Sequence, residues 1–346
     1  MTFDPHATAK QRVEALKQFI AELRADSSPI LLGPWRSELG FEATYWTPFL
    51  AWLAKQVPNF DTRAAVITRG GLARLYKTVA SQGYDLYALR SVTGIRRENL
   101  FDQKTTSLQK QIRITEWDEK VLADAAVALG LGLVYHTVHP AWMYWVLEPY
   151  WNESVGLQYL LGLTDYAPLP KPAKPHAPGL PEKYVAVKFY NRHTLHVLDP
   201  EVHTFIKQTV SVLASQTAVV LLNSASVYDD HSDVLCSGPN LFTLPELKPE
   251  ENLLMQAALL AHATAFVGTY GGMAQLAMRF QIPSVSFWKD EFTGTASAHH
   301  YVNWWVSKQQ HVPFLTGSIA ETWLWSQCTN VPPAITTAPQ VSEATA

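Results

Sequence analysis

The sequence has few charged residues and only two cysteines for its length. Charged residues make up 16% of the 346 positions, and the formal net charge is −3. A protein that binds nucleic acid electrostatically carries a basic face or stripe, so this composition argues against a nucleic-acid partner. Cys236 and Cys328 lie outside any CxxC or Cys/His ligand pattern. We therefore expect two reduced thiols, with neither a disulfide framework nor a zinc site.

Membrane and secretion signals are also missing. The first residues, MTFDPHATAKQR, lack the charged-then-apolar pattern of a signal peptide. Residues 125–147 contain no Asp, Glu, Lys or Arg, but this stretch includes Gly130, Gly132 and Pro140. It therefore predicts a strand followed by a helix and not a membrane span. We expect a cytoplasmic protein.

Apolar residues, by contrast, are abundant at 47%, which is enough for two buried cores in a chain of two-domain length. In the first half, short apolar strands alternate with amphipathic helices. Strands are predicted at 29–33, 63–68, 84–89 and 131–136, and helices at 9–25, 43–56, 71–82 and 117–130. Such alternation favours a parallel sheet covered on both faces, an α/β fold of the Rossmann type.

A proline-rich segment separates this half from the next. Residues 167–181 hold six prolines in fifteen positions, which excludes a helix or a central strand. The alternation then resumes, with strands predicted at 184–189, 218–222, 264–268 and 284–287, and helices at 199–215, 250–262, 272–280 and 317–326. We expect an N-terminal domain over 1–165, a hinge over 166–182, a C-terminal domain over 183–330 and a flexible tail over 331–346.

The strongest functional pattern is the turn from Gly268 to Gly272, with the sequence GTYGG, between a predicted strand and a predicted helix. Glycine allows a sharp turn and a close ligand, and the amides at a helix N-terminus attract anions. The hydroxyl of Thr269 could add a donor. This turn predicts a phosphate site, although it matches neither GxGxxG nor a Walker motif, and a tight turn without a ligand is the alternative.

The loop after the first strand of the N-terminal domain is the second pattern. Trp35, Arg36, Glu38 and Glu42 gather there, where doubly wound folds line their interdomain cleft. Glu38 or Glu42 could be the general base for a hydroxyl nucleophile. The alternative is a helix N-terminus at which Ser37 and Glu38 only cap the helix and complement its dipole.

Further candidates follow other predicted strands. Arg69 could contact phosphate or substrate in the cleft, although a surface arginine beside a turn is the simpler interpretation. Lys188 and Arg192 are placed to meet a diphosphate. The remaining candidates are Asn223 and Glu291 for donor binding and His193 for substrate, all in loops that follow strands. His193 and His196 lack a third ligand, so no metal site is predicted.

Taken in order, the segments GPWRSELGFE, TRGG, VKFY, DDH and GTYGG resemble a group of bacterial glycosyltransferases of the GT-B architecture. The resemblance covers about residues 29–292. It implies two Rossmann-like domains that face each other across a cleft, with a nucleotide-sugar donor in the C-terminal domain and a saccharide or glycolipid acceptor in the N-terminal one. Gly271, Gly272 and either Lys188 or Arg192 would then hold the diphosphate.

This resemblance implies sugar transfer to a hydroxyl group in the synthesis of bacterial polysaccharide or glycoconjugate. It implies no bound metal and no cofactor besides the donor, and a location in the cytoplasm, with contact to the inner face of the membrane as an open alternative. The residues alone also allow a nucleotide-sugar epimerase on the same double fold, or a non-catalytic module that binds saccharides or protein partners. The oligomeric state is left open.

Overall fold

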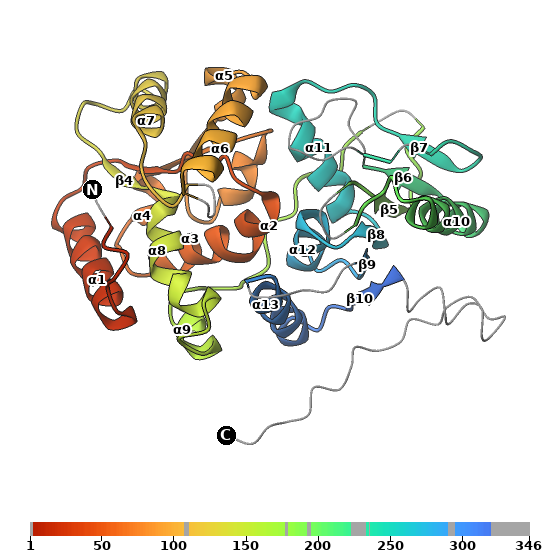
Figure 1. Cartoon of the computed structure of the whole chain (residues 1–346). Helices are drawn as coiled ribbons and strands as arrows, with labels where there is room; N and C mark the ends of the chain where they lie inside the picture. The colour runs from red at the N-terminus through yellow and green to blue at the C-terminus, as the bar shows by residue number, and fades with distance from the viewer. Residues whose placement is uncertain are drawn as a thin grey trace.

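The computed structural model describes residues 3–106, 111–176, 179–191, 195–222, 233–234, 236–289 and 295–319. Two parallel α/β units lie side by side (Figure 1), and each is built around one sheet. The predicted fold class, two Rossmann-like units, is confirmed. None of the helices in the described part of the chain is long and apolar enough to cross a membrane.

The N-terminal unit has a four-stranded parallel sheet in the order β3-β2-β1-β4. Its strands are short. The central strands β1 and β2 are fully buried, as expected for a sheet covered on both faces, whereas β4 is mostly half-buried and β3 is more exposed. Its elements are α1 (Ala9–Ala25), β1 (Ile30–Leu32), α2 (Leu39–Phe41), the π-helix η1 (Glu42–Trp46), α3 (Thr47–Ala54), α4 (Phe60–Arg63), β2 (Ala64–Thr68), the 3₁₀-helix η2 (Leu72–Tyr76), β3 (Gln82–Asp85), α5 (Leu86–Leu89), α6 (Val92–Thr106), α7 (Glu116–Ala128), β4 (His136–Val138), α8 (Pro140–Trp151) and α9 (Leu157–Leu161).

The C-terminal unit has a six-stranded parallel sheet in the order β10-β9-β8-β5-β6-β7. Counted from β5 as the first strand, this is the 3-2-1-4-5-6 order of dinucleotide-binding folds, and its topological switch point lies between β5 and β8. Its elements are β5 (Val185–Lys188), α10 (Pro200–Gln216), β6 (Val219–Leu221), β7 (Leu241–Thr243), α11 (Pro249–Ala261), β8 (Ala265–Thr269), α12 (Gly272–Arg279), β9 (Ser284–Trp288), α13 (Thr295–Gln309) and β10 (Phe314–Ser318).

Several helices begin at residues whose side chains cap the helix N-terminus. Thr8 forms a capping box with Gln11 at the start of α1, and the Asp199 side chain accepts the Glu201 amide at the start of α10. Three predictions are wrong. Residues 71–82 form only the short helix η2, a helix begins at Leu86 inside the predicted strand 84–89, and residues 314–318 form strand β10 where a helix was expected to begin at 317.

The predicted strand at 131–136 is also displaced, because β4 begins only at His136. Leu133 and Val134 lie on the surface instead, at 99% and 73% exposure. The apolar run was misleading because apolar residues also occur in exposed connections.

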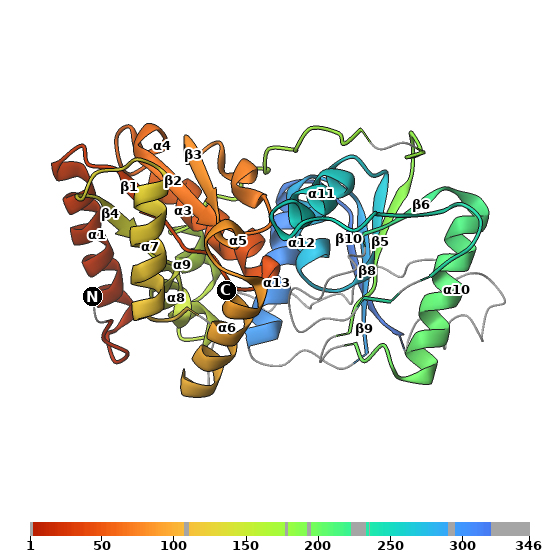
Figure 2. The same cartoon turned by 90° about the horizontal axis from the view of Figure 1, so that it is seen from above.

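The two units are joined by a packed junction as well as by the proline-rich segment. That segment contains no helix or strand in the part of 166–182 that the structure describes. One apolar cluster contains buried residues from both sheets, including Leu32 of β1 and Phe266 of β8. Helices α2, α12 and α13 meet at this junction (Figures 1 and 2). The functional candidates therefore lie beside a continuous core.

Candidate functional site

The glycine turn lies at the switch point of the C-terminal sheet. Gly268 pairs with Lys188 across β5 and β8, and a Cβ at Gly268 would lie 2.1 Å from the Lys188 carbonyl oxygen. The Thr269 hydroxyl accepts the Tyr190 amide at 3.0 Å and donates to the Tyr190 carbonyl at 3.2 Å. Gly268 and Thr269 therefore hold the ends of β5 and β8 together, which is a structural use of residues predicted to bind the donor.

The start of α12 faces the other unit. A Cβ at Gly272 would lie 2.9 Å from both the Gly40 amide nitrogen and the Leu39 Cβ. At Gly40 a Cβ would lie 2.3 Å from Gln275 Oε1. We expected an open cleft between the glycine turn and this N-terminal segment. The structure instead places their backbones in direct contact at Gly272 and Gly40. Gly272, Glu38 and Leu39 remain half-exposed at the edge of the contact, where the first-turn amides of α12 have no partner within the helix.

Lys188 is engaged inside its own unit. Its Nζ donates to the Leu222 carbonyl at 3.0 Å and to Gln256 Oε1 at 2.8 Å, and it contacts Asp233 Oδ2 at 3.3 Å. An ammonium group has three N–H donors, which these acceptors can satisfy. The side chain thus connects β5 to α11 and to the segment that follows β6, and diphosphate binding by Lys188 stays an untested prediction.

Glu42 lies in a closed polar network and not in an open cleft. Its carboxylate accepts hydrogen bonds from the Thr68 hydroxyl (2.8 Å), the Tyr76 hydroxyl (2.6 Å) and Arg69 Nη1 (3.0 Å). Glu42 and Arg69 are each 2% exposed. Burial and the neighbouring Glu42 charge raise the pKa of Tyr76 well above its usual value. The network ties η1 to β2 and η2 and gives both side chains a structural role, and their predicted contact with substrate stays untested.

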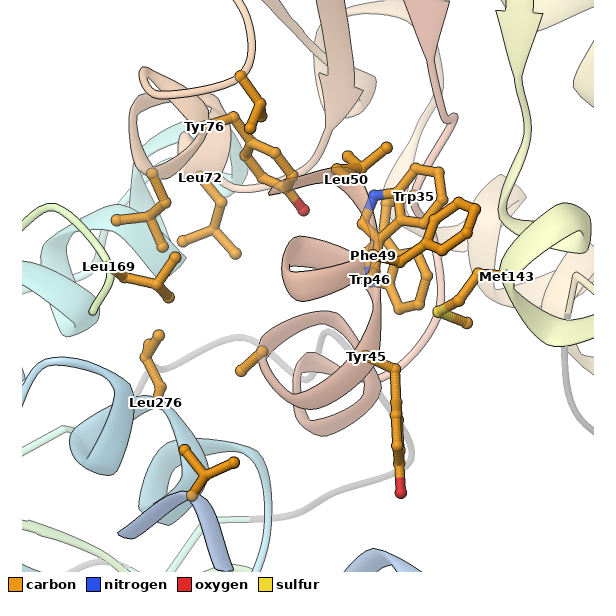
Figure 3. Close-up of a cluster of buried hydrophobic side chains, with 14 of the residues drawn as sticks. Trp35, Tyr45, Trp46, Phe49, Leu50, Leu72, Tyr76, Met143, Leu169 and Leu276 are labelled. Carbon is orange, nitrogen blue, oxygen red and sulfur yellow. The ribbon is translucent and has the colours of Figure 1, made fainter. Parts of the chain in front are cut away.

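Arg36 and Trp35 are also buried, against the expectation that they line the cleft. The Arg36 guanidinium donates to Asp118 Oδ1 at 3.1 Å, Asn99 Oδ1 at 2.7 Å and Asp102 Oδ2 at 2.5 Å. Burial favours the uncharged form of Arg36, but the charges and hydrogen bonds of Asp118 and Asp102 outweigh burial and raise the pKa of Arg36. Trp35 stacks on Trp46, with ring centroids 5.7 Å apart, inside the cluster of Figure 3. Both residues hold the N-terminal unit together.

Glu38 occupies a more open position than Glu42. It is half-exposed at the start of α2, and its Oε2 accepts the Ser37 hydroxyl at 2.6 Å. The Tyr144 hydroxyl donates to Ser37 Oγ at 3.3 Å, and burial together with the Glu38 charge raises the pKa of Tyr144. The Glu38 side chain makes no capping hydrogen bond to α2. Of the two predicted bases, only Glu38 lies beside the contact with Gly272.

Four other candidates, Arg192, His193, Asn223 and Glu291, lie outside the described residues. So do Asp229, Asp230 and His231. Their segments follow β5, β6 and β9, whose carboxyl ends share the edge of the sheet that carries the glycine turn. The predicted roles of Arg192, Asn223 and Glu291 in donor binding, and of His193 at the substrate, are untested. Within the ranges that the structure does describe, no three His, Cys, Asp or Glu side chains are grouped as metal ligands.

No family model and no curated protein matches the chain. Similar solved structures include the Escherichia coli heptosyltransferase WaaC with ADP, at 13% identity and a TM-score of 0.38, covering 82% of this chain and 98% of that one. The glycosyltransferase SnogD from Streptomyces nogalater has 11% identity and a TM-score of 0.36, with 84% and 87% covered. The iron-containing dodecameric glycosyltransferase TibC from enterotoxigenic E. coli has 13% identity and a TM-score of 0.41, with 78% and 60% covered. At these low values the likeness assigns neither substrate nor residue roles.

The junction also contains polar residues that the sequence patterns did not single out as site residues. Gln275, in the first turns of α12, donates to His299 Nε2 on α13. The His299 ring stacks on Phe41, with centroids 5.3 Å apart and planes 16° apart. His300 packs edge-on against Tyr270 of the glycine turn, and burial lowers the pKa of His300. Gln275 could have been noticed in the sequence as a polar residue among the apolar positions of the predicted helix. His299 and His300 could not be placed in the same way, because helix α13 was not predicted.

Proposed function

We propose that the protein transfers a sugar from a nucleotide-sugar donor to a hydroxyl group of a saccharide or glycolipid acceptor. The observation that supports this most is the junction itself. The helix that begins at a 3-2-1-4-5-6 switch point contacts the segment after the first strand of a second parallel sheet. Ligands of open α/β sheets bind outside the carboxyl ends of the strands at such a point. A donor there would lie beside Glu38.

In the proposed reaction Glu38 acts as the general base. Its carboxylate takes the proton of the acceptor hydroxyl, the hydroxyl oxygen attacks the anomeric carbon, and the bond from that carbon to the phosphate oxygen breaks. The electron pair of that bond leaves with the nucleoside diphosphate. The amides at the start of α12, at Gly271 and Gly272, would stabilise the charge of this leaving group. Arg192, Asn223 and Glu291 are proposed to complete the donor site.

The test is a panel of nucleotides and nucleotide sugars, measured by calorimetry on the full chain. We expect one nucleoside diphosphate to bind in preference to the others. Donor and acceptor turnover is then followed by NMR in the wild type, in Glu38→Gln and in Glu22→Gln, a matched control on the exposed side of α1. We expect turnover to fall by about a hundredfold or more in Glu38→Gln only.

Three outcomes would contradict the proposal. Absence of binding across the panel removes the donor site. Conversion of the donor into a second nucleotide sugar without any acceptor indicates an epimerase. Binding without turnover, unchanged in Glu38→Gln, indicates a non-catalytic binding module. Slow hydrolysis of the donor is distinguished from epimerisation by the free sugar that it releases.

A further inference from the structure

A cavity of about 270 Å³ lies between the N-terminal unit, the proline-rich segment and α12. Thr47 and Ala51 of α3 form one wall, Tyr76 lies in a second, Pro168 and Leu169 come from the connecting segment, and Arg279 lies at the end of α12. Tyr76 and Leu169, from elements far apart in the chain, both lie at the edge of the cluster in Figure 3. The volume is just below that of drug-sized ligand pockets, which is about 300–1,000 Å³.

Arg279 gives this cavity a buried positive charge. The residue is 1% exposed, and no carboxylate among the described residues is at ion-pair distance from its guanidinium. Nη1 donates to the Ala43 carbonyl at 2.7 Å and Nη2 to the Ala167 carbonyl at 2.8 Å. Its Nε atom is buried and has no hydrogen-bond partner in the described part of the chain. Burial lowers the pKa of Arg279 to about 10.

The Arg279 guanidinium lies over the Tyr166 ring, with its Cζ 5.5 Å from the ring centroid, and the Asp165 charge acts on it from a distance. A buried charge without a carboxylate in direct contact is still costly, and an unmade hydrogen bond adds to that cost. A carboxylate that entered the cavity would supply the opposite charge to the Arg279 guanidinium. The acidic groups that also line the cavity are nearer to solvent. Asp165 pairs with Lys55 at 2.6 Å, and Asp61 is exposed. The most deeply buried charge of the lining is therefore positive, which favours an anion over a cation.

The apolar lining of the cavity indicates what the uncharged part of a ligand would be. Ala51, Ala54, Leu75 and Val79 line the cavity together with Pro168 and Leu169. These apolar side chains would contact a short hydrocarbon chain. We propose that this cavity is a binding site for a small monocarboxylate with an apolar chain, with its carboxylate at Arg279. The site is separate from the proposed donor site and does not depend on the proposed function.

The position of the cavity connects its occupant to the junction. Arg279 binds the carbonyl of Ala43 in η1, and Glu42 of the same π-helix accepts the hydroxyl of Tyr76 from the cavity wall. Gly272, at the other end of α12 from Arg279, contacts Gly40. A ligand at Arg279 would thus bridge α3, the connecting segment and α12, which are the elements that set how the two units meet.

The experiment measures the binding of butanoate, hexanoate and octanoate to the full chain by tryptophan fluorescence and by ligand-observed NMR. We expect affinity to rise about fourfold per methylene until the cavity is filled. Hexanol and hexylamine, of matched chain length, test the charge. We expect both to bind at least about tenfold more weakly than hexanoate, because they lack the charge-assisted hydrogen bond.

Two variants test the location. Arg279→Gln should lose about tenfold or more in hexanoate affinity. Because this change can also unfold the junction, Ala51→Leu is the second variant: it fills the cavity from the half-exposed side of α3 and leaves Arg279 in place. It should abolish binding, whereas Ala123→Leu, on the exposed side of α7, should not. Equal binding of hexanol, preference for hexylamine, or full affinity in folded Ala51→Leu would each overturn the proposal, as would absence of binding in the wild type.

Discussion

Glu38 and Glu42 are four residues apart but lie in different environments. Glu42 is 2% exposed and accepts hydrogen bonds from Thr68, Arg69 and Tyr76, whereas Glu38 is half-exposed beside the junction. Burial requires Glu42 to have these partners, because an unpaired buried carboxylate is costly. Its role is therefore to stabilise the N-terminal unit, and Glu38 is left as the candidate for proton chemistry.

Replacement by glutamine should destabilise the protein at Glu42 but hardly at Glu38. Glu42→Gln removes the carboxylate that pairs with the buried Arg69 guanidinium, and we expect the free energy of unfolding to fall by about 3–5 kcal/mol. Glu38→Gln should change it by about 0.5 kcal/mol or less, as for a half-exposed position. Urea unfolding of both variants checks this. A Glu42→Gln protein as stable as the wild type would show that the network does not hold the fold.

At the scale of elements, α12 is held at both of its ends. Its first residue, Gly272, touches Gly40 of the other unit, and its last, Arg279, binds carbonyls of η1 and of the connecting segment. The helix therefore connects the proposed donor site to the N-terminal unit. The close contact with Gly40 and Leu39 explains a glycine at position 272 without any ligand.

Gly272→Ala tests that packing reason. The added methyl group would lie 2.9 Å from both the Gly40 nitrogen and the Leu39 Cβ, so the two units must separate slightly. We expect the unliganded protein to lose about 1–3 kcal/mol of stability. Gly132→Ala, where a Cβ meets nothing within 4 Å, is the matched control. If Gly272→Ala loses nucleotide affinity at unchanged stability, the glycine serves the ligand and not the contact.

The largest apolar cluster of the described residues runs through both units, and each unit also has a smaller cluster of its own. The apolar cluster includes Leu32 and Val66 of the first sheet together with Ala186 and Phe266 of the second. Units that share buried residues in this way lose part of their core when they separate, unlike domains joined only by a linker.

We therefore expect a single cooperative unfolding transition for the full chain. Tryptophan fluorescence reports on seven tryptophans before the proline-rich segment and five after it. It should change at the same urea concentration as the far-ultraviolet circular dichroism, which reports on the helices of both units. Two resolved transitions would contradict this expectation and would indicate that the units fold independently.

The sequence by itself determined the architecture and the position of the turn. The alternation of apolar strands with helices and the proline-rich segment both act through local physical chemistry, so they were readable without a structure. The glycine turn after β8 was located correctly because only its neighbours in the chain define it. The resemblance to glycosyltransferases came from the order of such short motifs.

Only the tertiary structure decided what the charged loop residues do. Arg36, Glu42 and Arg69 carry the residue types of a substrate site, yet their partners, such as Asp118 and Tyr76, are distant in sequence and bury them. The sequence indicated neither the contact of Gly272 with Gly40 nor the unpaired Nε of Arg279. Burial and ion pairing depend on which surfaces meet when the chain folds, and that information is not local. Glu38 remains the candidate base because folding leaves it at the edge of the junction.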